Sequence, residues 1–305
     1  MATFLVRRLF GAVLVLFGVA ITVFLILHLT GDPAMVMLPP EASRADIATF
    51  RHEYGFDKPV LLQFADFAAR AVRGDFGNSI RHGDPAMSEA LGRLPATGEL
   101  AFAALLLACV VAIPAGIIAA AKRESVFDYL MRGVSLVGQA APVYWLGIML
   151  ILIFGVQLNW LPIAGRGGLS HLILPTITLG AFTTARLMRI TRSGMLDVSR
   201  ADYVRTALAK GLTPIAVTVK HALRNTIIPI VTVIGLELGN LLSGAVITET
   251  IFSWPGIGRL AVQAIYDRDY PVVEAVVILT AVAFVGINLL VDVLYAALDP
   301  RVTYR

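Results

Sequence analysis

The sequence predicts an all-α integral membrane protein with six transmembrane helices, and two observations lead to this fold class. First, 57% of the 305 residues are hydrophobic and 15% are charged, with a mean hydropathy of +0.79, whereas soluble domains are about half apolar and about a quarter charged. Second, apolar residues gather in segments of about 20 residues, the length with which an α-helix crosses the hydrocarbon core. The predicted spans are 9–29, 96–121, 133–156, 171–190, 227–247 and 272–298.

The first apolar segment follows Arg7 and Arg8, as the core of a signal peptide would. It is longer than the usual signal core of about 7–15 residues, and Gly31-Asp32-Pro33 follows it in place of a small-residue cleavage site. We therefore expect residues 1–30 to form a short tail and a retained first transmembrane helix.

Residues 31–95 differ in kind, because they carry mixed charge and the pair Pro39-Pro40. They predict a small folded insert outside the membrane, with a helix near 42–54 and a glycine-rich segment at 74–79. That segment could contact a ligand, but a turn that packs the insert onto the helices is the commoner role of such a sequence.

Residues 199–229 are too polar to lie in lipid, although an apolar segment flanks them on each side. Ser199 and Asp202 have the spacing of a capping box, which predicts a short helix that begins there and ends at Lys210. Gly211 would supply the left-handed residue that ends this helix.

A second short helix is predicted directly after Gly211. Thr213 is a suitable N-cap, and Pro214 stands at the first helical position, where its missing N–H costs nothing. This helix should run toward Arg224, before Pro229 and the next apolar run. Both helices are amphipathic and basic, so each should pack one face on the membrane bundle and offer the other to a soluble partner.

Basic residues fix the orientation, because short cytoplasmic segments of membrane proteins carry an excess of lysine and arginine. Six spans place both termini on one side of the membrane. If that side is cytoplasmic, the two short outside loops hold only Arg166, Arg259 and Arg268. The inside segments then hold Arg7, Arg8, Lys122, Arg123, Arg132, Arg189, Arg192, Arg200, Arg205, Lys210, Lys220, Arg224, Arg301 and Arg305. We expect cytoplasmic termini, a cytoplasmic 199–229 loop and an external insert.

Several polar residues fall within the predicted spans, where an ionisable group costs on the order of 3 kcal/mol and so should face the bundle interior or a water-filled path. Glu237, Asn240 and Asn288 are the translocation-path candidates. A hydrogen-bonded contact between helices is as good an explanation for Glu237 and a better one for Asn288. The small residues that would allow two subunits to approach along the fifth span are Gly235, Gly239, Ser243 and Gly244.

Catalytic and cofactor chemistry find little support in the sequence. No Gly-x-x-x-x-Gly-Lys-Ser/Thr phosphate loop is present, so energy from a nucleotide would have to come through a partner. The five histidines lack metal-ligand spacing, and Cys109 is the single cysteine. We expect no catalytic residue, no metal and no cofactor bound by this chain.

An ordered set of motifs resembles the inner-membrane permease subunits of bacterial ABC importers for dipeptides, oligopeptides and glutathione, a group that also includes nickel permeases. The motifs are Thr30-Gly31-Asp32-Pro33, Gly74-Asp75-Phe76-Gly77-Asn78-Ser79, 202–211, His221-Ala222-Leu223-Arg224-Asn225, Trp254-Pro255-Gly256-Ile257-Gly258, Arg268-Asp269-Tyr270-Pro271 and Asp299-Pro300-Arg301. They run nearly from end to end of the chain.

The resemblance implies a type I importer permease in the bacterial inner membrane, with a five-helix core at 96–298 and a cytoplasmic tail at 299–305. It implies a homologous permease partner, two ATPases that hold ATP and Mg²⁺, and an external substrate-binding protein. Residues 199–229 would be the EAA loop that docks on the ATPase, although Arg205, Thr206 and Ala207 replace its Glu-Ala-Ala. The implied coupling residues are Tyr203, Arg205, Ala207, Ala209, Lys210, Gly211, His221, Arg224 and Asn225.

Three alternatives to a peptide permease stay open at this point. The first is a nickel permease, because peptide and nickel permeases of this group share these motifs. A secondary transporter would show repeated halves with broken helices, whereas this chain has one loop of the EAA kind. An intramembrane enzyme would need a nucleophile and its base, or metal ligands, at membrane depth.

Overall fold

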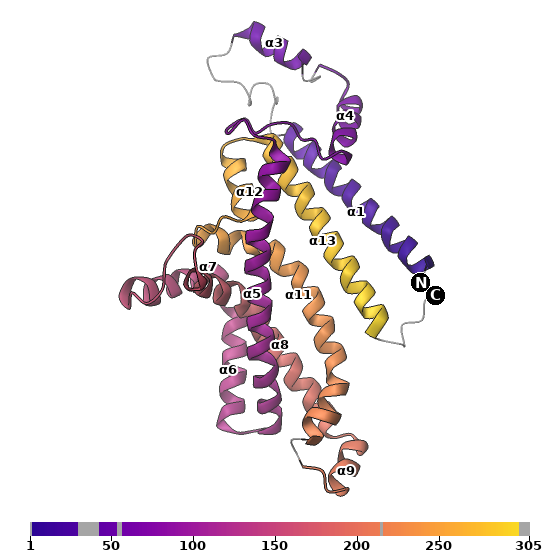
Figure 1. The fold of residues 1–305 in the computed structure, drawn as a ribbon, viewed down its shortest axis with the longest axis vertical. Coiled ribbons are helices and arrows are strands. Elements are labelled where there is room, and N and C mark those ends of the chain that lie inside the picture. Colours follow the sequence, from indigo (N-terminus) through magenta and orange to yellow (C-terminus); the bar gives the residue numbers. More distant parts are fainter. Residues whose placement is uncertain (1, 30–42, 54–56, 214–215, 299–305) are drawn as a thin grey trace. The chain divides into compact units, whose positions relative to one another are not determined.

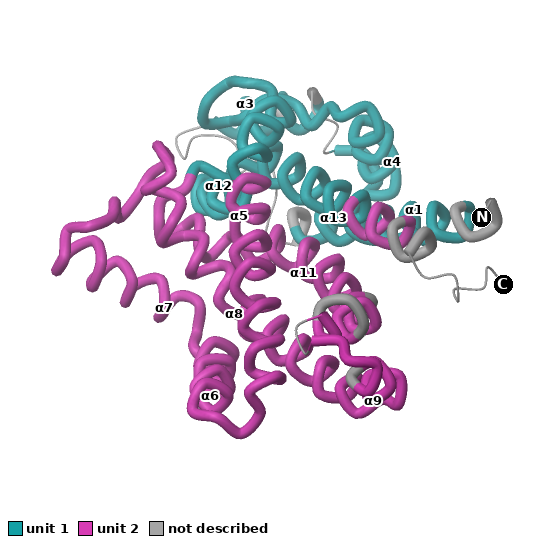
Figure 2. The backbone as a smooth tube through the Cα atoms, turned by 60° about the horizontal axis from the view of Figure 1, so that its bottom comes forward, with its two compact units in different colours: residues 1–96, 255–286, 304–305 teal, residues 97–254, 287–303 magenta. Residues whose placement is uncertain are grey.

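A computed structural model describes residues 2–29, 43–53, 57–213 and 216–298. The regular structure in these ranges is helical, apart from one isolated bridge between Asn78 and Pro85 (Figure 1). The predicted tail at 299–305 and the motif at 30–33 lie outside the described residues. The chain divides into two compact units, coloured in Figure 2. Unit 1 comprises Met1–Ala96, Pro255–Gly286 and Tyr304–Arg305, and unit 2 comprises Thr97–Trp254 and Ile287–Thr303.

Unit 1 combines the N-terminal helices with two segments from late in the chain. Its helices are α1 (Ala2–Leu29), α3 (Arg44–Glu53), α4 (Val60–Val72), the start of α5 (Ala86–Ala121), α12 (Ile257–Tyr266) and the start of α13 (Tyr270–Leu298). α3 confirms the helix predicted near 42–54. The buried core joins Phe24, Phe67 and Phe76 to Ile257 and Leu260, so burial of aromatic side chains holds the insert to the helices.

The glycine-rich segment at 74–79 is a turn that packs on this core. Gly74 has φ +72° and Gly77 has φ +79°, left-handed conformations that favour glycine. Between them, Phe76 is 5% exposed and its ring lies 6.4 Å from that of Phe67, measured between ring centroids. The packing role predicted from the sequence is therefore the one the geometry supports.

A buried hydrogen bond ties this turn to the connection between α12 and α13. The Ser79 hydroxyl donates to Asp269 at 2.5 Å, and both residues are 3% exposed. The Arg81 N–H donates to the same carboxylate oxygen at 3.3 Å, and the His82 N–H donates to the Ser79 hydroxyl at 3.0 Å. Two motifs that lie 190 positions apart in the chain therefore meet in one polar cluster.

Replacing Ser79 by alanine should destabilise unit 1 by about 1–3 kcal/mol, because the buried Asp269 carboxylate loses its short hydrogen bond. Its other oxygen already has no partner among the described residues. Unfolding in detergent with increasing denaturant would measure the change. Ser88→Ala is the matched control, since Ser88 is exposed, and equal stability of the two variants would contradict the prediction.

Unit 2 is a helical bundle that contains the rest of α5 and α13. Its other helices are α6 (Val126–Ala140), α7 (Val143–Leu150), the π-helix η1 (Ile151–Gln157), α8 (Leu169–Ser199), α9 (Asp202–Ala209), the π-helix η2 (Val217–Ala222) and α11 (Leu223–Ile251). α8 packs most extensively on α11 and α6, so α8 is the central helix of this unit.

Glycines allow several helices of unit 2 to approach closely. A Cβ atom on Gly116 of α5 would lie 2.8 Å from the Met188 carbonyl oxygen, and one on Gly194 of α8 would lie 2.6 Å from Thr226. A Cβ on Gly235, one of the small residues proposed to face a second subunit, would lie 2.5 Å from Val291 of this same chain. Gly235 therefore serves packing within unit 2.

Four described helices are long and apolar enough to cross a membrane by themselves: 6–26, 86–121, 223–251 and 270–293. The third predicted span is bent, because α6 and the α7–η1 pair meet at 109°. The predicted span 133–156 is therefore a broken pair of helices and not one continuous helix. Pro142 forces the preceding residue out of the helical region, and Ala141 is extended, with φ −69° and ψ 125°.

The fourth predicted span, 171–190, corresponds to α8, which does not reach the apolarity of those four helices. α8 carries Arg186, Arg189 and Arg192, yet much of its length is buried within unit 2, including Leu174, Leu179 and Leu187. A helix that is surrounded by other helices needs less apolar surface than one that faces lipid. The six predicted spans therefore correspond to four apolar helices, one bent pair and the buried helix α8.

Candidate functional site: the 199–229 loop and the polar contacts of unit 2

The first helix of the predicted coupling loop starts later than expected. α8 continues through Ser199, whose hydroxyl donates to the Leu196 carbonyl at 2.8 Å, and α9 begins at Asp202. The capping-box prediction at Ser199 was wrong, because the packed helix α8 extends beyond the apolar segment. Gly211 has φ +84°, which confirms the predicted left-handed turn after the helix.

The second loop helix is capped as predicted, since the Thr213 hydroxyl accepts a hydrogen bond from the Ala216 N–H at 3.3 Å. Pro214 lies outside the described residues. The helix does not end near Arg224, because η2 continues directly into α11, which contains Pro229. Transmembrane helices accommodate proline because neighbouring groups satisfy the carbonyl that it frees.

α9 folds back on the start of this continuous helix. Val204 and Ala207 are buried with Val217, and the Asn225 amide donates to the Tyr203 hydroxyl at 2.7 Å. The opposite surface is exposed and basic. The exposed predicted coupling residues of the loop are Tyr203, Arg205, Ala209, Lys210, Gly211, Arg224 and Asn225, and the side chain of His221 lies outside the described part. The loop therefore has one packed face and one open face.

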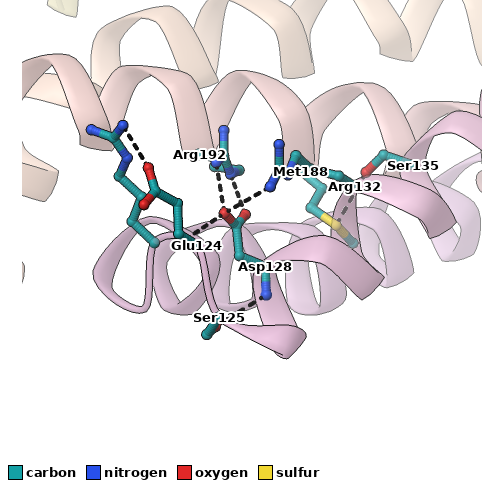
Figure 3. A network of polar contacts seen from close by, with 8 residues as sticks. Glu124, Ser125, Asp128, Arg132, Ser135, Met188 and Arg192 are labelled. Carbon is teal, nitrogen blue, oxygen red and sulfur yellow. Dashed lines mark hydrogen bonds and ion pairs between the residues drawn. The ribbon is translucent and has the colours of Figure 1, made fainter.

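A polar cluster ties the start of α6 to α8 on the same unit (Figure 3). Asp128, with no exposed surface, accepts two hydrogen bonds from Arg192 at 2.6 and 2.8 Å. Arg132 lies 3.5 Å from the same carboxylate, and the Glu124 N–H donates to it at 3.0 Å. Such bidentate, charge-assisted contacts fix the geometry of both helices.

Sequence reasoning missed this cluster, although a signal was present. Ser125 and Asp128 have the capping-box spacing, and the Asp128 N–H donates to the Ser125 hydroxyl at 3.3 Å. The same spacing at Ser199 and Asp202 marks no helix start. Ser125 stands directly before the first residue of α6, whereas Ser199 is the last residue of α8. The spacing is the same in both places, so packing of the helices decides which serine is a cap.

Glu237, the first translocation-path candidate, is 2% exposed and bound by two residues of α8. Arg186 donates to it at 2.6 Å, and the Thr183 hydroxyl donates at 3.1 Å. The carboxylate is therefore part of a contact between α8 and α11, in which Glu237 is buried and Arg186 is partly exposed. Asn240 is exposed and Asn288 is half-buried.

Two more acidic residues of unit 2 have partners that sequence patterns did not reveal. Glu249 of α11 is buried and accepts a hydrogen bond from Thr97 of α5 at 2.6 Å. Glu99 accepts a hydrogen bond from the Arg166 Nε at 2.9 Å. Each pair joins residues far apart in the chain, so a single sequence gives no cue to the pairing.

Two family models match the chain. The model of the binding-protein-dependent transport system inner membrane component matches residues 112–304. The model of the N-terminal region of such membrane components matches residues 1–101. Together they cover both units and include α5, the helix that runs from one unit into the other.

Full-length relatives agree with these models. The dipeptide transport system permease protein DppB of Alkalihalophilus pseudofirmus is 41% identical over 333 aligned residues. The glutathione transport system permease protein GsiC of Escherichia coli K12 is 42% identical over 306 aligned residues. The di/tripeptide permease protein DppB of Pseudomonas aeruginosa is 41% identical over 335 aligned residues. Each alignment covers 100% of this chain and 100% of the relative.

Solved structures show the same fold. The methionine ABC transporter MetNI in inward-facing conformations aligns with a TM-score of 0.59 and 17% identity, over 70% of this chain and 97% of the other. An amino acid ABC transporter aligns with a TM-score of 0.51. The architecture is that of type I ABC transporter permeases. The chain is thus a membrane transport subunit that belongs to the family of binding-protein-dependent transport system inner membrane components.

Proposed function

We propose that this chain is one permease subunit of an ATP-driven importer of small peptides. The relatives named for dipeptides, di/tripeptides and glutathione support this cargo class, since glutathione is itself a small peptide. A homologous permease would complete the path, an external binding protein would deliver the peptide, and two ATPases would hold ATP and Mg²⁺. Both termini and the 199–229 loop would face the cytoplasm of a bacterial cell.

The observation that carries the proposal is the two-faced loop of α9 and η2. Its buried face, built from Val204, Ala207 and Val217, fixes the loop to the transmembrane helices. Its open face carries Arg205 and Lys210, which suits an acidic groove on a soluble partner. Coupling requires that the docked loop be stabilised differently in the two states of the ATPases.

The translocation path would run beside α11. Glu237 forms an ion pair with Arg186, so we propose that Glu237 acts by orienting Arg186 and not by direct contact with cargo. The Arg186 side chain keeps 37% of its surface exposed, and a guanidinium binds a carboxylate well. Arg186 and the exposed Asn240 are thus proposed to meet the peptide, while the half-buried Asn288 serves helix packing.

Affinity purification in mild detergent, followed by mass spectrometry, tests the partners. The wild-type chain should recover an ATPase and a second permease. Reversing the open face with Arg205→Glu and Lys210→Glu should remove the ATPase and leave the permease. Arg73→Glu is the matched control, because Arg73 is also exposed but lies in the insert. Recovery of the chain alone, from membranes that contain the candidates, would contradict the importer.

Replacing Gly211 by leucine should lower ATP-driven uptake about tenfold, because a left-handed residue costs non-glycine side chains about 1–2 kcal/mol. Gly211 has φ +84°, and a Cβ added there would meet nothing within 4 Å, so the penalty comes from the backbone and not from a clash. Uptake and ATP hydrolysis by the reconstituted complex would be compared with those of Gly211→Asn, since asparagine tolerates this conformation. Normal uptake by the leucine variant would reject a coupling role for the turn.

A further inference from the structure

Unit 1 contains a large apolar groove that the proposed transport function does not use. The groove lies between α1 and the α12–α13 segment and has a volume of about 930 Å³. In Figure 1, α1 and α13 run side by side. Its α1 wall includes Val15, Val19 and Ile26, and its opposite wall includes Ile265, Val273 and Val277. This volume is in the range of a complete small-molecule site, about 300–1,000 Å³.

Both walls of the groove come from helices or segments of apolar character. Both α1 and α13 belong to the apolar spanning helices, and neighbouring residues of α1 such as Phe10, Leu14 and Phe17 are more than half exposed. From Val15 to Ile26 the helical rise is about 16 Å at about 1.5 Å per residue. That length matches one leaflet, which is half of a hydrocarbon core of about 30 Å.

One positively charged residue lines the groove. Arg268 lines it and is exposed, two positions before Tyr270, the first residue of α13. Its backbone has φ +55°, an uncommon conformation that turns the chain between α12 and α13. In the part of the chain that the structure describes, its guanidinium makes no ion pair, and the neighbouring Asp269 is engaged by Ser79.

We propose that this groove binds one phospholipid, with its acyl chains along α1 and α13 and its phosphate on Arg268. The apolar walls suit the acyl chains of such a lipid, and their length suits chains that fill one leaflet. The Arg268 cation suits the phosphate. Arginine binds phosphate through two parallel hydrogen bonds. A wholly apolar transmembrane helix is a poorer occupant, because it would cover the Arg268 charge without bringing an anion.

The chain, with any subunits that purify with it, would be stripped of lipid in mild detergent and titrated with phosphatidylethanolamine or phosphatidylglycerol under native mass spectrometry. A diacylglycerol with the same acyl chains is the probe that lacks phosphate. Wild type should retain one phospholipid and bind it roughly tenfold more tightly than the diacylglycerol, since hydrogen bonds to charged groups are the strong ones. Equal binding of both probes would overturn the assignment of phosphate to Arg268.

Two sets of variants locate the site. Gly18→Leu should fill the groove and reduce lipid binding at least tenfold, because Gly18 lines it and a Cβ there meets nothing within 4 Å. Gly11→Leu is the matched control on α1, since Gly11 also has open space and does not line the groove. Arg268→Asn should abolish the preference for phosphate, and Arg268→Lys should keep most of it. Unchanged binding by Gly18→Leu would overturn the proposal.

A photo-crosslinking residue at Val19 separates lipid from protein as the occupant. Val19 is part of the α1 wall, so irradiation in native membranes should give an adduct with the mass of a phospholipid. An adduct with a second protein chain would instead make the groove a subunit interface and reject the lipid. The crosslinking result does not depend on cargo or on ATPase partners. Rejection of the lipid by this experiment would therefore leave the importer proposal intact.

Discussion

Replacing Arg186 by alanine should destabilise the folded chain by about 3 kcal/mol. Glu237 is 2% exposed and accepts its charge-assisted hydrogen bond from Arg186, and removing one member of a buried ion pair leaves an uncompensated charge. We expect the low end of the usual range, about 3–5 kcal/mol, because the Arg186 side chain is 37% exposed. Unfolding by sodium dodecyl sulfate in mixed micelles would give the free energy.

The control for this prediction is Arg189→Ala on the same helix, since Arg189 is exposed. A double variant with leucine at both Arg186 and Glu237 should recover most of the stability, because apolar side chains often replace an ion pair without loss. Its uptake would then report on transport separately from folding. Wild-type stability of Arg186→Ala would show that the ion pair contributes nothing to folding.

Gly116→Leu should lower the stability of unit 2 by about 3 kcal/mol or prevent folding, because added atoms in a packed contact force the helices apart. A Cβ at this position lies 2.8 Å from a backbone oxygen of α8, the Met188 carbonyl, which no side-chain rotation can relieve. Yield of folded protein after heating, followed by size-exclusion chromatography, would measure the loss.

Gly98→Leu is the matched control for the close approach. Gly98 lies on the same helix, α5, but a Cβ there meets nothing within 4 Å. The two variants therefore differ in the contact with α8 and not in helix propensity. Similar behaviour of both would mean that α5 and α8 separate easily, and that the short distance at Gly116 is not a constraint.

Composition and apolar length sufficed to predict the fold class, since lipid demands such helices whatever the details of packing. Local rules also succeeded at Gly211 and Thr213, where one residue determines the backbone geometry. The rules failed where packing decides. α8 extends beyond its apolar segment to Ser199 because neighbouring helices cover it. At Pro142 two sequence signals conflict: proline disfavours a helical residue before it, while the continuous apolar run predicts one unbroken helix. The structure is bent there, so the proline signal is the correct one.

The polar partners were the least predictable part of the candidate site. Glu237 attracted attention as a charge within a span, but Arg186 lies 51 positions away in the chain and sequence spacing does not pair them. Asp128 and Arg192 are separated by 64 positions. Such pairs depend on how two helices are rotated against each other, which hydrophobic periodicity specifies only coarsely.

The Arg186–Glu237 pair has a consequence for how the chain enters the membrane during synthesis. The ribosome makes α8 before α11, so Arg186 reaches the translocon while its carboxylate partner does not yet exist. An unpaired arginine at the centre of a helix costs about 2.5–3.5 kcal/mol of insertion free energy. α8 should therefore wait at the protein-lined side of the translocon until α11 arrives, so that Arg186 and Glu237 enter the bilayer as a neutral pair.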